Sequence, residues 1–180
     1  IQWIFRLKCI DPGGAIFRLD IQAPWNEWDR KNPHVLEYLE QKGYQKATGG
    51  IVASAAGKLY SGWLAATGTY GGAIAVTDPV SGRTSLFQNP AGTQAIAGLA
   101  LNGEYLFAGT SVEADGLPPK PDAKPQFAVL GLDTVQPYWS RGFEGKKTVN
   151  RLLYNGAAEC VVMAVHDVLY LFDNKAMAVR

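Results

Sequence analysis

The sequence predicts an all-β protein made of β-propeller blades, with about four four-stranded antiparallel units in its 180 residues. A short apolar phrase ending in aspartate recurs along the chain, and recurrence on this scale indicates a repeat architecture. Turn residues separate the apolar runs, and the middle strands are apolar on both faces, which is typical of sheets covered on both sides. Small sheets sandwiched between neighbours are propeller blades. The recurring aspartates are Asp20, Asp78, Asp133 and Asp173.

The third unit is the most regular. Its strands are expected over 95–101, 104–110, 127–132 and 137–143, with a long loop over 111–125. The pair Asn102-Gly103 predicts a tight two-residue turn with positive φ at both residues.

The other units follow the same template. The second is expected to have strands over 51–54, 59–63, 73–77 and 83–88, and the fourth over 151–154, 160–165, 168–172 and 176–179. The first has strands only over 2–8 and 15–19. In each unit the recurring aspartate is expected to begin the turn to the outer strand.

Residues 21–48 are predicted to be a helical insertion between the first and second blades. Asn32-Pro33 matches a helix N-cap followed by proline at the first helical position. Apolar residues then recur at helical spacing and Gly43 is a suitable stop, so a short helix is expected over 34–42.

The run Gly-x-Ile-x-Val-x-Asp-Pro-x-Ser-Gly-Arg over 72–83 resembles blades of bacterial propellers of the lactonase, virginiamycin-lyase-like and quinoprotein-dehydrogenase-like groups. The strand followed by Gly-Thr over 106–111 is similar to the same blades. The resemblance implies six to eight blades, whereas residues 1–180 supply about four in a single domain. We therefore expect a portion of a larger propeller whose remainder is another chain or lies outside this sequence, which a start at Ile1 in mid-blade favours. A closed four-bladed ring is the alternative.

The composition indicates which kinds of partner and which location to expect. The net charge is +1 with scattered Lys and Arg, so neither nucleic acid nor an anionic membrane surface is expected, and no apolar stretch is long enough for a membrane span. Cys9 and Cys160 are expected to be buried free thiols. A disulfide between them is the alternative and would favour an extracellular home. An extracellular or periplasmic location is favoured, although the sequence does not determine it.

Function is expected on the loops between the second and third strands, which open on one face of a propeller. Glu113 and Asp115 with backbone carbonyls could hold Ca²⁺, but no Asp-x-Asp-x-Asp-Gly spacing is present and a solvated loop is favoured. His166 beside Asp167 could be a general base or part of a two-residue turn, and the turn is favoured. The candidate binding residues are Trp63, which is placed at a strand end facing the loops, with Tyr70, Thr110, Glu113, Asp115 and His166.

No catalytic site is predicted. Two histidines cannot form a His-rich metal cluster, and there is no Gly-x-Ser-x-Gly motif. The predicted inner strands begin with Gln94 and Asn150 but with no carboxylate. We expect a non-catalytic propeller that binds a protein, or a carbohydrate or other small molecule, on the loop face. The alternative, implied by the resemblance, is a lactonase-like hydrolase or lyase whose channel metal is completed by residues outside this chain. A quinone-dependent dehydrogenase would need tryptophan-docking repeats, which are not evident.

Overall fold

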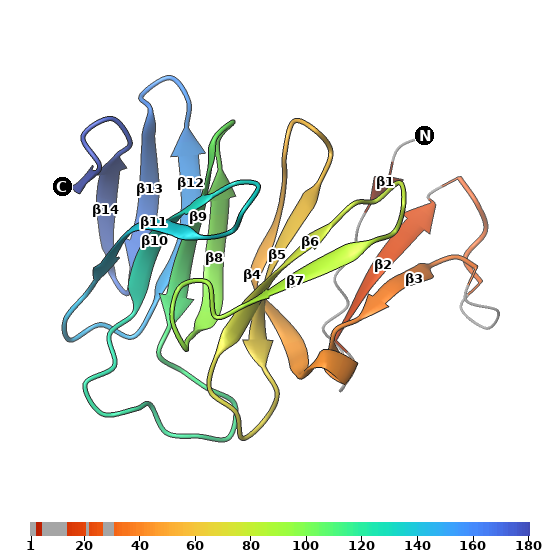
Figure 1. The fold of residues 1–180 in the computed structure, drawn as a ribbon, viewed down its shortest axis with the longest axis horizontal. Coiled ribbons are helices and arrows are strands. Elements are labelled where there is room, and N and C mark those ends of the chain that lie inside the picture. The colour runs from red at the N-terminus through yellow and green to blue at the C-terminus, as the bar shows by residue number, and fades with distance from the viewer. Residues whose placement is uncertain (1–2, 5–13, 21, 27–30) are drawn as a thin grey trace.

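The computed structural model describes residues 3–4, 14–20, 22–26 and 31–180, and every structural statement below concerns these residues. They form four antiparallel sheets, each a meander of consecutive strands (Figure 1). The first sheet has three described strands: β1 (Trp3–Ile4), β2 (Ala15–Asp20) and β3 (His34–Tyr38). The second has β4 (Tyr44–Ala53), β5 (Leu59–Ala65), β6 (Gly72–Thr77) and β7 (Thr84–Gln88).

The third and fourth sheets repeat this order. The third has β8 (Ala95–Leu101), β9 (Tyr105–Ser111), β10 (Gln126–Gly131) and β11 (Pro137–Gly142). The fourth has β12 (Val149–Asn155), β13 (Cys160–Val165), β14 (Val168–Asp173) and β15 (Ala178–Val179). These bounds confirm the strands predicted for the second, third and fourth units, with β4 and β12 beginning earlier than predicted.

The four sheets follow one another across the molecule, with β1–β3 at one end and β12–β15 at the other (Figure 1). The strand β8 contacts β4 on one side and β12 on the other, so the first strands of these sheets lie side by side. The array is open, because the first and last sheets lie at opposite ends. The closed four-bladed ring is therefore not the arrangement of this chain.

Three apolar clusters fill the spaces between successive sheets. Ile16 and Trp63 belong to the cluster between the first and second sheets, Ile74 and Leu130 to that between the second and third, and Val129 to that between the third and fourth. Alternate residues of one strand thus serve two cores, since Leu130 and Val129 point to opposite faces of β10. This explains why the middle strands are apolar on both faces.

Glycine allows the sheets to approach closely. A Cβ built on Gly109 of β9 would lie 2.2 Å from the carbonyl oxygen of Val149, which begins β12. The adjacent sheet therefore comes too near for any side chain at this position, and the Gly-Thr feature at the end of β9 has a packing role.

The predicted helix over 34–42 is wrong. His34–Tyr38 is the strand β3, which pairs with β2 in the first sheet, and only Glu40–Lys42 forms a turn of 3-10 helix. A helix here would leave the edge of β2 without backbone partners, and that cost outweighs a weak local propensity. Residues 34–38 therefore belong to the first sheet and are not part of a helical insertion. The predicted stop is confirmed, because Gly43 has a φ of 86°.

The turn predicted at Asn102-Gly103 also differs from expectation. Neither residue has a positive φ, and the connection between β8 and β9 has three residues, 102–104. The Asn102 Oδ1 atom instead accepts hydrogen bonds from the backbone N–H groups of Glu104 (2.8 Å) and Tyr105 (2.6 Å). The side chain, rather than a left-handed backbone, makes this turn.

Three of the recurring aspartates, Asp20, Asp78 and Asp173, have the turn role that the sequence predicts, and Asp20 Oδ1 accepts from the Gln22 N–H at 2.9 Å. Asp78 Oδ1 accepts from the N–H groups of Val80 (2.8 Å) and Ser81 (3.2 Å), and these bonds lower the pKa of the Asp78 carboxyl. Asp173 Oδ1 accepts in the same way from Lys175 (3.0 Å) and Ala176 (2.9 Å). At these three positions the carboxylate closes the turn after the third strand. The Asp133 carboxylate instead lies 3.8 Å from Lys58 Nζ, and in its turn the Gln136 N–H donates to Thr134 Oγ1 at 3.4 Å.

Candidate functional site

Two loops meet at one end of the array and form the candidate site. They are the β5–β6 loop (residues 66–71) and the β9–β10 loop (residues 112–125), which lie together at the lower edge of Figure 1. The Tyr70 hydroxyl donates a hydrogen bond to the Pro118 carbonyl at 2.7 Å, and the Gly68 N–H donates to the Asp115 carbonyl at 2.8 Å. The second and third sheets are thus joined through their loops.

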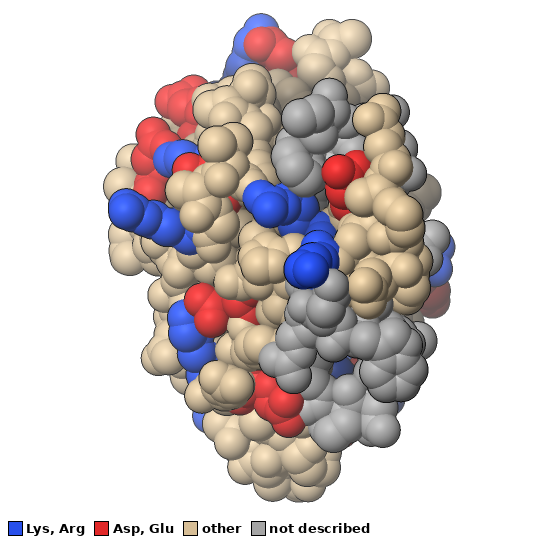
Figure 2. All heavy atoms as spheres, turned by 90° about the vertical axis from the view of Figure 1, so that its right-hand side faces the viewer, with Lys and Arg blue, Asp and Glu red and all other residues tan. Residues whose placement is uncertain are grey.

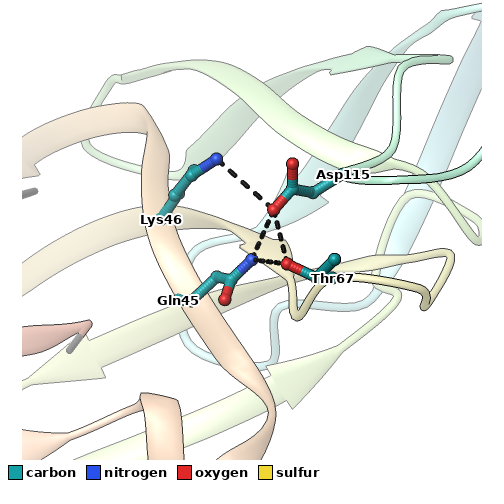
Figure 3. Close-up of polar contacts among 4 residues, drawn as sticks. All are labelled: Gln45, Lys46, Thr67 and Asp115. Carbon is teal, nitrogen blue, oxygen red and sulfur yellow. Dashed lines mark hydrogen bonds and ion pairs between the residues drawn. The ribbon is translucent and has the colours of Figure 1, made fainter. Parts of the chain in front are cut away.

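Asp115 is the centre of this joint (Figure 3). Its Oδ2 atom accepts hydrogen bonds from Gln45 Nε2 at 2.6 Å and Thr67 Oγ1 at 2.7 Å, and it lies 3.4 Å from Lys46 Nζ. The Thr67 hydroxyl is the largest cause that lowers the pKa of the Asp115 carboxyl, and Lys46 and Gln45 add to it. The carboxylate is therefore ionised at neutral pH and holds the long loop against β4 and the β5–β6 loop.

The structure does not bring Glu113 into this joint. Glu113 is exposed, and its backbone N–H bonds to Ser111 Oγ at 3.2 Å. Among the described residues there is no group of three or more His, Cys, Asp or Glu side chains that could hold a metal ion. Calcium binding by this loop stays a prediction that these contacts do not test.

Trp63 does not lie on the loop face as predicted. The strand β5 continues to Ala65, so Trp63 is inside the sheet, 1% exposed, in the cluster between the first and second sheets. Its indole N–H donates to Ser61 Oγ at 2.8 Å. Trp63 is a core residue, and the sequence missed this because no turn residue marks the end of the strand.

Thr110 is also fully buried and belongs to a hydrogen-bond network. Its hydroxyl donates to Gln94 Oε1 and accepts from the backbone N–H of Gln126 at 2.7 Å. The other end of the Gln94 amide donates to the Lys124 carbonyl at 2.8 Å. Thr110 and Gln94 therefore position the end of the long loop.

His166 occupies a two-residue turn between β13 and β14, as favoured from the sequence. It is exposed, has a φ of 57°, and its backbone N–H donates to the Thr148 carbonyl at 3.1 Å. The neighbouring Asp167 carboxylate lies 3.5 Å from Lys146. His166 thus belongs to a different sheet from the joint around Asp115.

A cavity of about 550 Å³ lies beside the long loop, and the sequence did not predict it. Lys120 crosses Tyr70, with Nζ 4.6 Å from the ring centroid and 3.4 Å from Thr93 Oγ1. In the described part of the chain no carboxylate forms an ion pair with Lys120, whereas Lys124 pairs with Glu144. The polar residues that line the cavity include Tyr70, Thr93, Lys120, Lys124, Gln126 and Ser140.

The remaining predictions concern partners and the thiols. Among the described residues, acidic and basic side chains are interspersed on the side of the molecule next to the first sheet (Figure 2). Within the described ranges no helix is long and apolar enough to cross a membrane. Cys160 has a free, half-buried thiol, whereas Cys9 lies outside the described residues.

No protein-family model and no curated protein matches the sequence. Among solved structures, the chain is similar to dihydro-heme d1 dehydrogenase NirN in complex with DHE, with a TM-score of 0.56 and 13% identity over 92% of this chain and 34% of that chain. It is also similar to a chain of a mitotic checkpoint complex, with a TM-score of 0.43 and 10% identity over 93% and 57% of the two chains. The second likeness is too weak to carry an argument.

The sheet array and the likeness to NirN define the class of protein: this chain consists of β-propeller blades. It spans about a third of the length of the NirN chain. At this identity the likeness concerns the fold alone, because one propeller fold serves many functions.

Proposed function

We propose that the chain is a non-catalytic binding portion of a β-propeller, with residues 1–180 forming one domain within a larger propeller or multi-chain assembly. The observation that carries the binding role is the cavity of about 550 Å³ beside the joined loops. This volume lies within the range of roughly 300–1,000 Å³ that is usual for small-molecule sites.

The loops around the cavity are held in place before any ligand arrives. Asp115 fixes the first half of the long loop through Gln45 and Thr67, and Gln94 holds its end at the Lys124 carbonyl. Tyr70 is fixed by its bond to Pro118. Binding to such a site costs little ordering of loops, which favours affinity.

The lining favours a polar, hydroxylated small molecule of the carbohydrate class. Thr93 and Ser140 offer hydroxyl groups, Gln126 offers a side-chain amide, and Tyr70 offers an aromatic ring. The site carries little net charge, because the lining includes the carboxylate of Asp122 as well as Lys120 and Lys124, and Lys124 is paired with Glu144. A neutral sugar satisfies hydroxyl and amide groups without requiring a net charge in the site.

Titration calorimetry with a panel of hexoses and disaccharides tests the ligand class. We expect at least one sugar to bind, and we expect Gln126→Leu and Lys120→Ala each to weaken it about tenfold, which corresponds to losing one hydrogen bond or contact of about 1.4 kcal/mol. The control His166→Ala, on the exposed turn of the fourth sheet, should bind as the unaltered chain does. If no sugar binds, or if both variants retain full affinity, the proposed site is wrong.

The alternative is a lactonase-like hydrolase or lyase with a channel metal, and it rests on the sequence resemblance to bacterial blades. It would need metal ligands at the beginnings of the inner strands. There the Gln94 side chain already bonds to Thr110 through Oε1 and to the Lys124 carbonyl through Nε2. Stoichiometric calcium or zinc in the purified protein, together with hydrolysis of a lactone, would favour this alternative over a binding role.

A further inference from the structure

The β9–β10 loop contains a proline-rich run that the fold presents to solvent. We call residues 117–121 the proline segment, and its three prolines, Pro118, Pro119 and Pro121, are all exposed. The loop hangs below the ends of the strands at the lower edge of Figure 1. Pro118 and Pro119 do not line the cavity, so the proposed binding site does not account for them.

Local sterics hold the backbone of the proline segment in an extended form. The rings of Pro118, Pro119 and Pro121 fix φ at about −65°, and the peptide bonds before them are trans. A residue that precedes proline is disfavoured from helical backbone angles, which restricts Leu117, Pro118 and Lys120 to the β or polyproline II region. Every residue of the segment is therefore restricted by a proline, and the segment favours a polyproline II helix.

The threefold repeat of a polyproline II helix decides which side chains face outward. Leu117 and Lys120 are three residues apart and face the protein, because Leu117 is half-buried and Lys120 Nζ lies 4.6 Å from the ring centroid of Tyr70. Pro118 and Pro121 are also three residues apart, and they form a ridge on another side that is exposed. A rise of 3.1 Å per residue separates the two rings of this ridge by about 9 Å.

The fold fixes the proline segment through hydrogen bonds near its two ends. The Tyr70 hydroxyl donates to the Pro118 carbonyl at 2.7 Å, and the Ala123 N–H donates to the Lys120 carbonyl at 3.2 Å. In the part of the chain that the structure describes, no backbone N–H donates to the Pro119 carbonyl. The segment thus loses little freedom when it binds a partner, and it offers that partner a hydrogen-bond acceptor.

We propose that the proline segment is a docking element for a protein domain that recognises polyproline II helices. The partner carries a groove lined by aromatic side chains, as SH3 and WW domains do. Pro118 and Pro121 enter two neighbouring spaces between these rings, and a tryptophan N–H or tyrosine hydroxyl of the groove donates to the Pro119 carbonyl. This inference goes beyond the sugar site and does not depend on it.

Biolayer interferometry of the whole chain against a panel of purified SH3 and WW domains tests the proposal. We expect at least one domain to bind the unaltered chain. The double variant Pro118→Ala, Pro121→Ala should raise the dissociation constant at least about tenfold, because both side chains of the ridge are lost. The matched control is Pro137→Ala, at an exposed position outside the segment, and it should bind as the unaltered chain does.

Circular dichroism of each variant separates lost contacts from lost folding. Pro121→Ala alone serves instead if the double variant does not fold, and it should weaken the same interaction. The proposal is overturned if no domain of the panel binds the unaltered chain. It is also overturned if a folded ridge variant binds as tightly as the Pro137→Ala control, because the contact would then lie elsewhere.

Sugar titration of the same samples separates this contact from the proposed cavity. Pro118→Ala should leave sugar affinity unchanged, because Pro118 does not line the cavity. A chain that binds a domain of the panel but no sugar overturns the role of the cavity and supports the docking element. A chain that binds sugar but no domain does the reverse.

Discussion

Replacement of Trp63 by alanine tests whether this side chain stabilises the fold or binds a ligand. The indole is 1% exposed, packs in the cluster with Ile16 and Leu39, and bonds to Ser61 Oγ at 2.8 Å. Truncation of a fully buried tryptophan costs about 3–5 kcal/mol. The entropy of unfolding of a domain of this size is about 0.38 kcal/mol/K, so we expect the melting temperature to fall by about 8–13 °C.

Differential scanning calorimetry measures this shift directly. Trp25→Ala is the matched control, since Trp25 is 56% exposed and its removal should change the melting temperature by only about 1 °C. Sugar affinity, measured well below the melting temperature of the variant, should stay within about twofold because Trp63 does not line the cavity. A normal melting temperature together with lost binding would refute the assignment of Trp63 to the core.

Three further substitutions test the packing, the loop joint and the turns. Gly109→Ala places a Cβ 2.2 Å from the Val149 carbonyl oxygen, so urea unfolding should show a loss of about 1–3 kcal/mol or more. Asp115→Asn removes a carboxylate whose pKa is lower in the folded chain than in the unfolded chain, where it is about 3.9. The ionised carboxylate therefore stabilises the folded chain above about pH 3.9, and this stabilisation is lost as the pH falls through the folded pKa. The difference in melting temperature between this variant and the unaltered chain should be seen at pH 7 and should shrink as the pH falls below about 3.9 and through the lower folded pKa. Asn102→Ala should cost about 1 kcal/mol in urea unfolding because two turn N–H groups lose their acceptor.

Each of these expectations has an outcome that contradicts it. A Gly109→Ala chain as stable as the original would mean that the third and fourth sheets are farther apart than described. A difference for Asp115→Asn that is unchanged across the acid range would mean that its carboxyl is not held ionised. Asn102→Asp keeps the acceptor, so it should restore the stability that Asn102→Ala loses; equal losses in both would exclude the side-chain turn.

Local chemistry explains what could be predicted from the sequence. Asp78 and Asp173 bond to N–H groups only two and three residues ahead, so their role follows from the neighbouring residues alone. The strands of the second, third and fourth sheets could be predicted because turn residues separate their apolar runs in the sequence.

The predictions from sequence were wrong where contacts between residues far apart in the sequence determine the structure. Residues 34–38 form a strand because β2 offers a backbone edge that lies more than twelve residues earlier in sequence. Trp63 is buried because the first sheet covers β5, and no local signal records that cover. Asp115 receives its hydrogen bond from Gln45, which is 70 residues away, so the loop joint has no sequence signature.

The sequence by itself determined the repeat, the turns that punctuate it and hence the class of fold, because each turn depends on hydrogen bonds between near neighbours. Only the tertiary structure decided which apolar residues are covered. Ile74, Val129 and Leu169 have the same place in the repeat, yet two are buried and one is exposed. Burial of a side chain depends on the presence of a neighbouring sheet, and the local sequence around the residue carries no information about whether that sheet is present.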